Sequence, residues 1–177
     1  MIKAWADQLD THPHTMGPLH GVPFCVSDDI DIEGLDTTLG LSVNLYKPKL
    51  ETAVVVRVLQ QAGAIPFCKT NMSQTTLPGS SGNPIFGTTV NPLNKALSPG
   101  GSSSGNGCLI KGAGVFFGLG TDLGGSLRIP AHMCGVASLR PTNHRNSDVG
   151  VARVLQDIAG CKSNSSFLAL IPVFKIF

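Results

Sequence analysis

Residues 98–130, SPGGSSSGNGCLIKGAGVFFGLGTDLGGSLRIP, decide the fold of this chain. They contain two serines in glycine-rich surroundings, Ser102 in GGSSSG and Ser126 in DLGGSLR. Glycine runs bring backbone N–H groups together in conformations that other residues avoid, and such groups form a concave set of donors for an anion. The apolar run at 115–120 between the serines predicts a buried strand. We therefore expect both serines to lie in loops around that strand.

Ser126 closes the second glycine run, and this position predicts acyl-transfer chemistry. A carbonyl oxygen held by the N–H groups of the run would have its carbon beside the Ser126 hydroxyl. The candidate donors are the backbone N–H groups of Leu123, Gly124, Gly125 and Ser126. Two other interpretations stay open. The segments can be ordinary Gly/Ser loops, or they can bind phosphate, although the sequence contains neither GxxxxGK[ST] nor a GxGxxG that opens a helix after a strand.

The composition fits one α/β core that does not bind nucleic acid. The chain has 177 residues, of which 42% are hydrophobic and 14% charged, which suffices for one sizeable core. A net charge of +2 without a basic cluster gives no basis for nucleic-acid binding. The five cysteines stand far apart and lack CxxC pairing, so we expect buried, reduced thiols and a reducing compartment.

Neither a membrane span nor a metal site is predicted. The first ten residues lack the continuous apolar region of a signal peptide, and no run reaches the roughly eighteen apolar residues of a spanning helix. His12, His14 and His20 lie in a proline-punctuated loop without a carboxylate or thiol at ligand spacing, so we expect solvated histidines rather than a zinc site. We expect no cofactor, no metal and a cytoplasmic location.

The remaining pattern predicts alternating helices and strands. Apolar spacing predicts strands at 22–26, 64–68 and 115–119 and helices over 2–10, 52–63, 106–111 and 149–158. We expect Thr52 to cap the second helix and Gly63 to end it, with Val55, Val58 and Leu59 on one buried face. Residues 73–98 are expected to form a surface loop with one short helix at most, and 167–177 a short apolar tail.

Three further segments accompany the glycine loops, namely GPLHGVP at 17–23, NPIFGTTVNP at 83–92 and CGVASLRPT at 134–142. Together with those loops they resemble the amidase signature family of serine hydrolases, and their residues are most similar to those of the fatty acid amide hydrolases. The resemblance implies the fold class α/β, a truncated amidase-signature α/β/α domain with a mixed β-sheet. It divides the chain into residues 1–142, the N-terminal part of that domain, and residues 143–177, a divergent C-terminal tail.

The resemblance also implies roles for single residues. The family's nucleophile falls on Ser126, its bridging serine that relays a proton on Ser102, and its oxyanion hole on residues 123–126. Thr76 and Leu77 fall on the wall of the acyl-chain channel and are the predicted substrate-binding residues. Fatty acid amide hydrolases tend to be aromatic or otherwise bulky there, so the chain departs from a lipid-amide pattern.

The catalytic lysine of the family falls on Ser27, seventh in the count from Gly21. A serine hydroxyl is a poor base at neutral pH, so we expect catalysis to be impaired. Asp28 and Asp29 follow on an extended segment, where at most one of them can face the site, and we expect caps or turn residues rather than a replacement base. Family members carry a second lysine where this chain has Lys69, for which we expect a structural or surface role.

We therefore predict an amidase homologue whose amide hydrolysis is weak or absent. A small-molecule amide or acyl substrate is expected, together with peripheral membrane contact. Fatty acid amide hydrolases of animals often carry an N-terminal membrane helix, and we expect none here, which is a first departure from the family. An alternative is a non-catalytic pseudoenzyme or fragment that binds an acyl or amide ligand, forms a homo-oligomer or pairs with a full-length relative. A third hypothesis is a chain without a settled fold.

Overall fold

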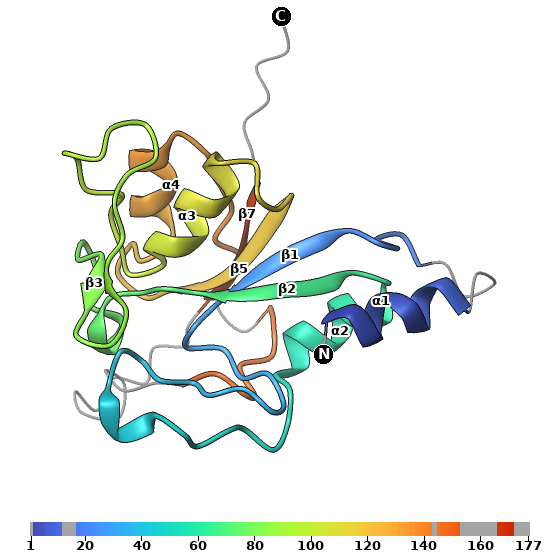
Figure 1. Ribbon diagram of the computed structural model, residues 1–177. Coiled ribbons are helices and arrows are strands. Elements are labelled where there is room, and N and C mark those ends of the chain that lie inside the picture. Colours follow the sequence, from blue (N-terminus) through green and yellow to red (C-terminus); the bar gives the residue numbers. More distant parts are fainter. Residues whose placement is uncertain (1, 12–16, 143–144, 153–165, 172–177) are drawn as a thin grey trace, which may run out of the picture.

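A five-stranded mixed sheet with the strand order β2-β1-β5-β7-β6 forms the centre of the protein (Figure 1). The computed structural model describes residues 2–11, 17–142, 145–152 and 166–171. β1 is parallel to β2 and β5, whereas β7 is antiparallel to β5 and β6. The strands are β1 (Pro23–Ser27), β2 (Ile65–Thr70), β5 (Phe117–Asp122), β6 (Ala137–Ser138) and β7 (Ser166–Ile171). The predicted α/β fold with a mixed sheet is confirmed.

β1 is an interior strand of the sheet, and both of its faces are buried. Successive side chains on a strand point to opposite faces, so Phe24 and Val26 enter one apolar cluster while Cys25 enters another. The first cluster includes Val56 of α2 (Val54–Gln61), and Phe24 stacks on Phe117 with ring centroids 5.2 Å apart. The second includes residues of α3 (Ser104–Lys111) and α4 (Arg128–Cys134). Helices therefore cover both faces of the sheet.

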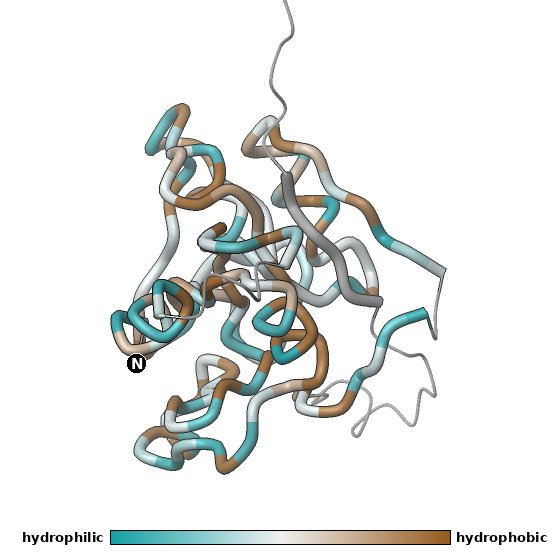
Figure 2. Tube along the Cα trace, turned by 90° about the vertical axis from the view of Figure 1, so that its right-hand side faces the viewer, coloured by the Kyte–Doolittle hydropathy of each residue, from teal (hydrophilic) through white to brown (hydrophobic). Residues whose placement is uncertain are grey.

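The first two predicted helices are confirmed, with corrections to the second. α1 (Ile2–Thr11) is amphipathic, and Figure 2 shows polar and apolar segments alternating around it beside the N mark. α2 begins after Ala53 without a side-chain cap, because the Thr52 hydroxyl accepts a hydrogen bond from the Glu33 N–H at 3.0 Å instead. The predicted buried face was also partly wrong, since Val58 is 55% exposed and Val56 is buried in its place.

The sequence pattern missed several short elements, among them α4, β6 and both strands of a short hairpin. α4 was not predicted, although Pro130 stands in its first turn, where proline costs no intrahelical hydrogen bond, and Gly135 ends it with a φ of 66°. Within 73–98 the structure has the expected short helix, a 3-10 turn at Gln74–Thr76, and also a hairpin of β3 (Gly82–Asn83) and β4 (Gly87–Thr88). Two-residue strands carry too few side chains to give a detectable alternation.

The chain after residue 142 joins the sheet and the loop after β1. β7 pairs with β5 and β6, and Val151 forms an antiparallel bridge with Ile30. The predicted helix over 149–158 is therefore wrong in its described part, residues 149–152, and the rest of it lies outside the described residues. The division of the chain at residue 142 stays a prediction. Among the helices that the structure describes, none is long and apolar enough to cross a membrane.

Gly120 of β5 lets the start of α3 approach the sheet closely. A Cβ at this position would lie 2.6 Å from Ser103 Oγ and 2.6 Å from Leu127 Cδ1. We expect Gly120→Ala to lower the free energy of unfolding by about 1–3 kcal/mol, because the neighbouring side chains are themselves buried and must shift. Urea denaturation measures the change.

Gly124→Ala is the matched control, because a Cβ there meets no atom closer than 4.0 Å and the φ of Gly124 is not in the left-handed region. It should alter the free energy of unfolding by less than about 0.5 kcal/mol. Equal stability of the two variants would contradict the close approach of α3 to β5.

Candidate active site

Ser126 lies in the loop between β5 and α4 and is nearly fully buried. The turn before it requires glycine at position 125, whose φ is 108°. The Ser126 hydroxyl donates a hydrogen bond to the Thr76 carbonyl at 3.5 Å, and the Ser126 carbonyl accepts one from the Ser103 N–H at 3.0 Å. The second contact joins the loop of Ser126 directly to the residue that follows Ser102.

The Asp122 carboxylate organises the Ser126 loop from inside. It accepts hydrogen bonds from the N–H groups of Gly125 at 2.8 Å, Leu127 at 3.2 Å and Arg128 at 3.1 Å. The Arg128 guanidinium binds both carboxylate oxygens, each at 2.9 Å. Burial opposes the charged form, but the bonds from Arg128 and the loop outweigh it and hold the pKa of Asp122 below its ordinary value. The Asp122 side chain therefore braces the glycine loop.

The same contacts change the set of candidate oxyanion donors. The Gly125 N–H, one of the four predicted donors, points at Asp122 Oδ1 and is already engaged. The N–H groups of Leu123, Gly124 and Ser126 are then the candidate donors of the loop. Thr121, the residue before Asp122, donates a hydrogen bond from its hydroxyl to the Asp29 carboxyl.

Ser102 lies two residues before the first residue of α3 and is fully buried. Its carbonyl accepts hydrogen bonds from the N–H groups of Ser73 at 3.1 Å and Ser104 at 2.9 Å, which fix the backbone. Its hydroxyl has no hydrogen-bond partner among the residues that the structure describes. A buried hydroxyl without a partner is costly, so Ser102 retains an unused donor and acceptor beside the Ser126 loop.

Ser27 is the last residue of β1 and points toward the start of α3. Its hydroxyl lies 3.4 Å from the Ser103 hydroxyl, and both side chains are fully buried. The structure thus brings together the three positions that the sequence singled out, because β1 and β5 run parallel and end at the same edge of the sheet. No lysine stands at Ser27, so the nearest ionisable groups decide whether the site contains a base.

Asp29 is the ionisable group that touches Ser27. It is fully buried, and the Thr121 hydroxyl donates a hydrogen bond to its Oδ2. Burial raises the pKa of Asp29 above its ordinary value, and the polar neighbours Thr121 and Ser27 only partly oppose the shift. A carboxyl group with a raised pKa is a poorer source of negative charge at that position, and its Oδ1 has no hydrogen-bond partner among the described residues.

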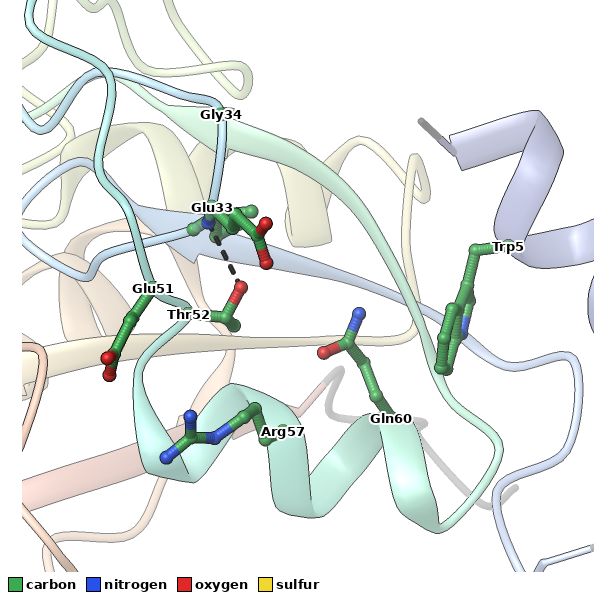
Figure 3. A pocket seen from close by; sticks show the side chains of 8 residues that line it. Trp5, Glu33, Gly34, Glu51, Thr52, Arg57 and Gln60 are labelled. Carbon is green, nitrogen blue, oxygen red and sulfur yellow. Dashed lines mark hydrogen bonds between the residues drawn. The ribbon is translucent and has the colours of Figure 1, made fainter.

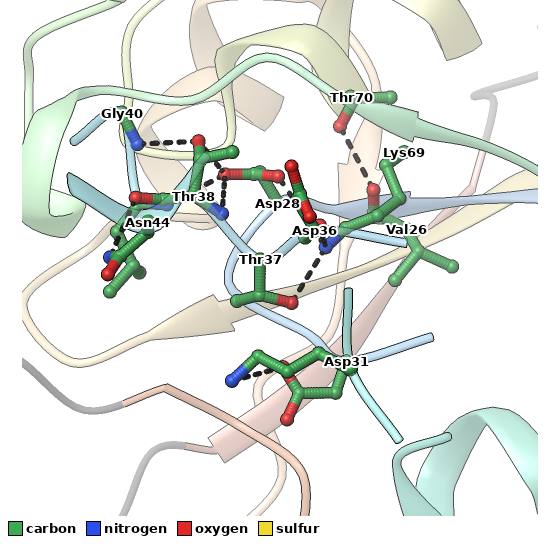
Figure 4. A network of polar contacts seen from close by, with 12 residues as sticks. Val26, Asp28, Asp31, Asp36, Thr37, Thr38, Gly40, Asn44, Lys69 and Thr70 are labelled. Carbon is green, nitrogen blue, oxygen red and sulfur yellow. Dashed lines mark hydrogen bonds and ion pairs between the residues drawn. The ribbon is translucent and has the colours of Figure 1, made fainter. Parts of the chain in front are cut away.

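Asp28 and Lys69 form a separate polar network on the loop side of the sheet (Figure 4). Asp28 Oδ2 accepts hydrogen bonds from the N–H groups of Thr38 at 3.0 Å and Leu39 at 2.8 Å. The Lys69 ammonium pairs with Asp28 Oδ1 at 3.5 Å and donates to the Asp36 carbonyl at 2.6 Å. Burial lowers the pKa of Lys69 while Asp28 opposes the shift. These contacts fit the expected structural role of Lys69.

The predicted substrate-binding residues differ in their position. Thr75 and Thr76 have φ values of 55° and 64°, which branched side chains adopt only at a cost in energy. This conformation directs the Thr76 carbonyl at Ser126. Leu77 is 54% exposed and its carbonyl is held by the Ser73 hydroxyl at 2.5 Å. Thr76 therefore touches the candidate nucleophile, and Leu77 borders the surface next to it.

A separate pocket of about 550 Å³ is lined by residues that do not include these serines (Figure 3). It is formed by α1, α2 and the loop after β1, and none of the predicted site residues lines it. Its walls are Trp5, Ile32, Glu33, Gly34, Glu51, Thr52, Arg57 and Gln60. Among the described residues no three His, Cys, Asp or Glu side chains gather to hold a metal ion. Of the histidines considered above, His12 and His14 lie outside those residues.

The sequence of the chain is similar to a family model and to known proteins. The family model Amidase matches residues 2–167. Vitamin D3 hydroxylase-associated protein of Gallus gallus is 47% identical over 135 residues, which are 76% of this chain and 29% of that protein. Fatty-acid amide hydrolase 1 of Sus scrofa is 45% identical over 76% of this chain and 23% of its own. The chain therefore spans less than a third of the length of these relatives.

Solved structures give the same result. A fatty acid amide hydrolase superposes with a TM-score of 0.83 at 31% identity, over 92% of this chain and 28% of that chain. A crystal structure of an amidase gives a TM-score of 0.82 at 32% identity, over 95% of this chain and 38% of that chain.

The Asp122 network predicts a measurable pH dependence. We expect Asp122→Asn to lower the free energy of unfolding by about 2–3 kcal/mol at pH 7, because its amide N–H groups would face the donors of Gly125 and Arg128. The folded-state pKa is lowered, so the stabilisation by Asp122 is complete above the unfolded-state pKa of about 4 and is lost as the pH falls through the folded-state pKa. The difference between variant and wild type should therefore shrink from about pH 5 to pH 2.

Urea denaturation at several pH values measures this difference. Asp7→Asn, the same chemical change in an exposed ion pair with Lys3, is the control and should change the free energy of unfolding by less than about 1 kcal/mol at every pH. A pH-independent loss in Asp122→Asn would show that the carboxylate charge does not stabilise the loop.

Proposed function

This chain belongs to the amidase family, and on that premise we propose that the Ser126 loop and the buried Ser102 are the acyl-transfer part of an amide-hydrolysing site. Ser126 is the nucleophile and Ser102 the bridging residue that relays its proton. The N–H groups of Leu123, Gly124 and Ser126 are the proposed donors to the oxyanion. The substrate class is a linear carboxamide.

One observation carries this proposal. The Ser103 N–H binds the Ser126 carbonyl at 3.0 Å, and the Ser103 hydroxyl lies 3.4 Å from that of Ser27. Segments from three distant parts of the sequence therefore meet at one edge of the sheet, each with a buried hydroxyl. Ordinary Gly/Ser loops need neither this convergence nor a buried hydroxyl without a partner, as at Ser102.

The proposed reaction proceeds through an acyl-enzyme. The Ser126 hydroxyl oxygen attacks the carboxamide carbon and passes its proton to Ser102, which gives up its own hydroxyl proton toward the leaving nitrogen, while the loop N–H groups hold the negative oxygen. The C–N bond breaks as the nitrogen takes this proton, and water later hydrolyses the acyl-enzyme and restores the Ser126 hydroxyl.

We propose that this reaction is slow in the present chain because the site lacks a base. Ser27 carries a hydroxyl where the proton relay needs an acceptor, and Asp29 beside it has a raised pKa. Loss of general-base help costs about 10²–10⁴ in rate. The Ser126 hydroxyl also donates to the Thr76 carbonyl, so its proton is directed away from a relay.

A second candidate function is a non-catalytic protein that binds an acyl or amide ligand or pairs with a longer relative. The observation in its favour is the apolar surface at the rim of the site. Leu77 and Leu123 are 54% and 39% exposed, and Pro78 Cγ comes within 4.0 Å of a Cβ built on Gly124, so these segments lie side by side. An acyl chain laid across this rim would cover both leucines.

Covalent labelling with a fluorophosphonate probe tests the proposed function. The unmodified chain should label slowly or not at all, and Ser27→Lys should raise the labelling rate by about 10²–10⁴ because an amine is supplied next to the serines. Ser126→Ala in the Ser27→Lys background should abolish the signal.

Two controls keep the result interpretable. Ser27→Met introduces a side chain of similar length without an amine and should leave the rate unchanged. Ser147→Ala removes an exposed hydroxyl and should also have no effect. Folded Ser27→Lys protein that labels no faster than Ser27→Met would contradict the proposed amidase site and favour the binding function.

A further inference from the structure

We propose that Cys108 and Cys134 form a reversible intramolecular disulfide between α3 and α4 when the protein meets hydrogen peroxide. Both cysteines are free thiols in the structure. This modification site does not depend on the proposed function, since it requires no substrate and no turnover.

The two thiols are neighbours across a helix pair. Cys108 lies in the middle of α3, and Cys134 is the last residue of α4, which packs against α3. The two thiols are close enough to shift each other's pKa, while the Cys108 thiol donates to the Val90 carbonyl at 3.3 Å and the Cys134 thiol to the Pro99 carbonyl at 3.6 Å. A Cβ built on Gly107 would lie 3.2 Å from Cys134 Sγ, so this sulfur rests against α3 one residue before Cys108. The absence of a side chain at Gly107 is what lets the sulfur come so close.

The two cysteines differ in access and in acidity, and the difference suits a two-step oxidation. Cys108 is partly exposed, whereas Cys134 is fully buried, so peroxide reaches Cys108 first. The neighbouring Cys108 thiol lowers the pKa of Cys134, and the positive charge of Lys111 acts in the same direction. The neighbouring Cys134 thiol and burial raise the pKa of Cys108, which makes the first step the slow one.

The chemistry balances with peroxide as the only oxidant. The Cys108 sulfur attacks one peroxide oxygen, the O–O bond breaks, and a sulfenic acid and one water molecule are formed. The Cys134 sulfur then attacks the Cys108 sulfur and displaces hydroxide. The hydroxide takes the Cys134 thiol proton and leaves as a second water molecule. Two thiols and one peroxide thus give one disulfide and two water molecules. A dithiol reductant reverses the reaction by thiol–disulfide exchange.

The other described cysteine pair provides an internal comparison. Cys25 and Cys68 face each other on the parallel strands β1 and β2. Cys25 is fully buried, its thiol donates to Asn106 Oδ1 at 3.3 Å, and burial raises the pKa of both thiols. No lowered pKa is found on either partner, so we expect this pair to stay reduced under conditions that oxidise Cys108 and Cys134.

The disulfide would join the two helices that begin at the candidate catalytic serines. α3 starts two residues after Ser102, and α4 starts two residues after Ser126. A covalent link between these helices restricts the unfolded chain, and we expect the midpoint of thermal unfolding to rise by about 5–10 °C on oxidation.

Peptide mapping by mass spectrometry after mild peroxide treatment tests the proposal. The full chain is oxidised, free thiols are blocked, and digestion is carried out without reductant. We expect a linked peptide that contains Cys108 and Cys134, its disappearance after dithiothreitol, and its absence in Cys108→Ser and Cys134→Ser. Cys68→Ser is the matched control and should still give the linked peptide together with the rise in unfolding temperature.

Two results would overturn the proposal. One is a Cys108 peptide that carries sulfinic acid, or that is linked to any cysteine other than Cys134, in oxidised wild-type protein. The other is recovery of Cys108 and Cys134 as blocked thiols after peroxide has oxidised other cysteines. Both are read from the wild-type chain, so the proposal stays testable even if a cysteine variant fails to fold.

Discussion

The buried carboxylate of Asp122 is the constraint on which the rest of the site depends. It stands at the end of β5 and binds three N–H groups of the following loop and the guanidinium of Arg128. The Arg140 side chain, just beyond β6, donates to the Asp122 carbonyl at 2.9 Å. One residue therefore joins the central strand, the Ser126 loop and α4 to the segment after β6. Because the buried N–H groups of Gly125 and Leu127 would otherwise have no partner, the loop has one favourable conformation.

The second constraint is the close approach of α3 to the sheet. Gly118 and Gly120 leave no side chain on the face of β5 that α3 covers, and Asn106 of α3 donates to the Leu119 carbonyl at 2.7 Å. Ser102 and Ser103 are thereby held against Ser126 and Ser27. We propose that the site departs from the family's chemistry at Ser27, at the end of β1, so that an assembled serine cluster lacks a base.

Much of this was predictable from the sequence because glycine runs and strand periodicity are local signals. They identified the loops of Ser102 and Ser126 and the strand that leads into Ser27, whereas the mixed sheet was implied by the family resemblance. They could not show that Thr52 would bind the Glu33 N–H rather than cap α2, or that Thr121 would bind Asp29. The hydroxyls of Thr52 and Thr121 each had a plausible local hydrogen-bond partner, but in the structure each is bonded to a residue distant in sequence. The hydrogen bond from the Gly125 N–H to Asp122 depends on the backbone conformation of the loop, which cannot be read from the sequence.

The central claim is that Ser27 occupies the place from which a base would serve Ser102. A crystal structure of the Ser27→Lys variant tests it most directly. The account predicts that the lysine Nζ lies within about 3 Å of Ser102 Oγ and gives this hydroxyl the partner it now lacks. A lysine that pairs with Asp29 alone and leaves the Ser102 hydroxyl unpartnered in a well-folded protein would contradict the account.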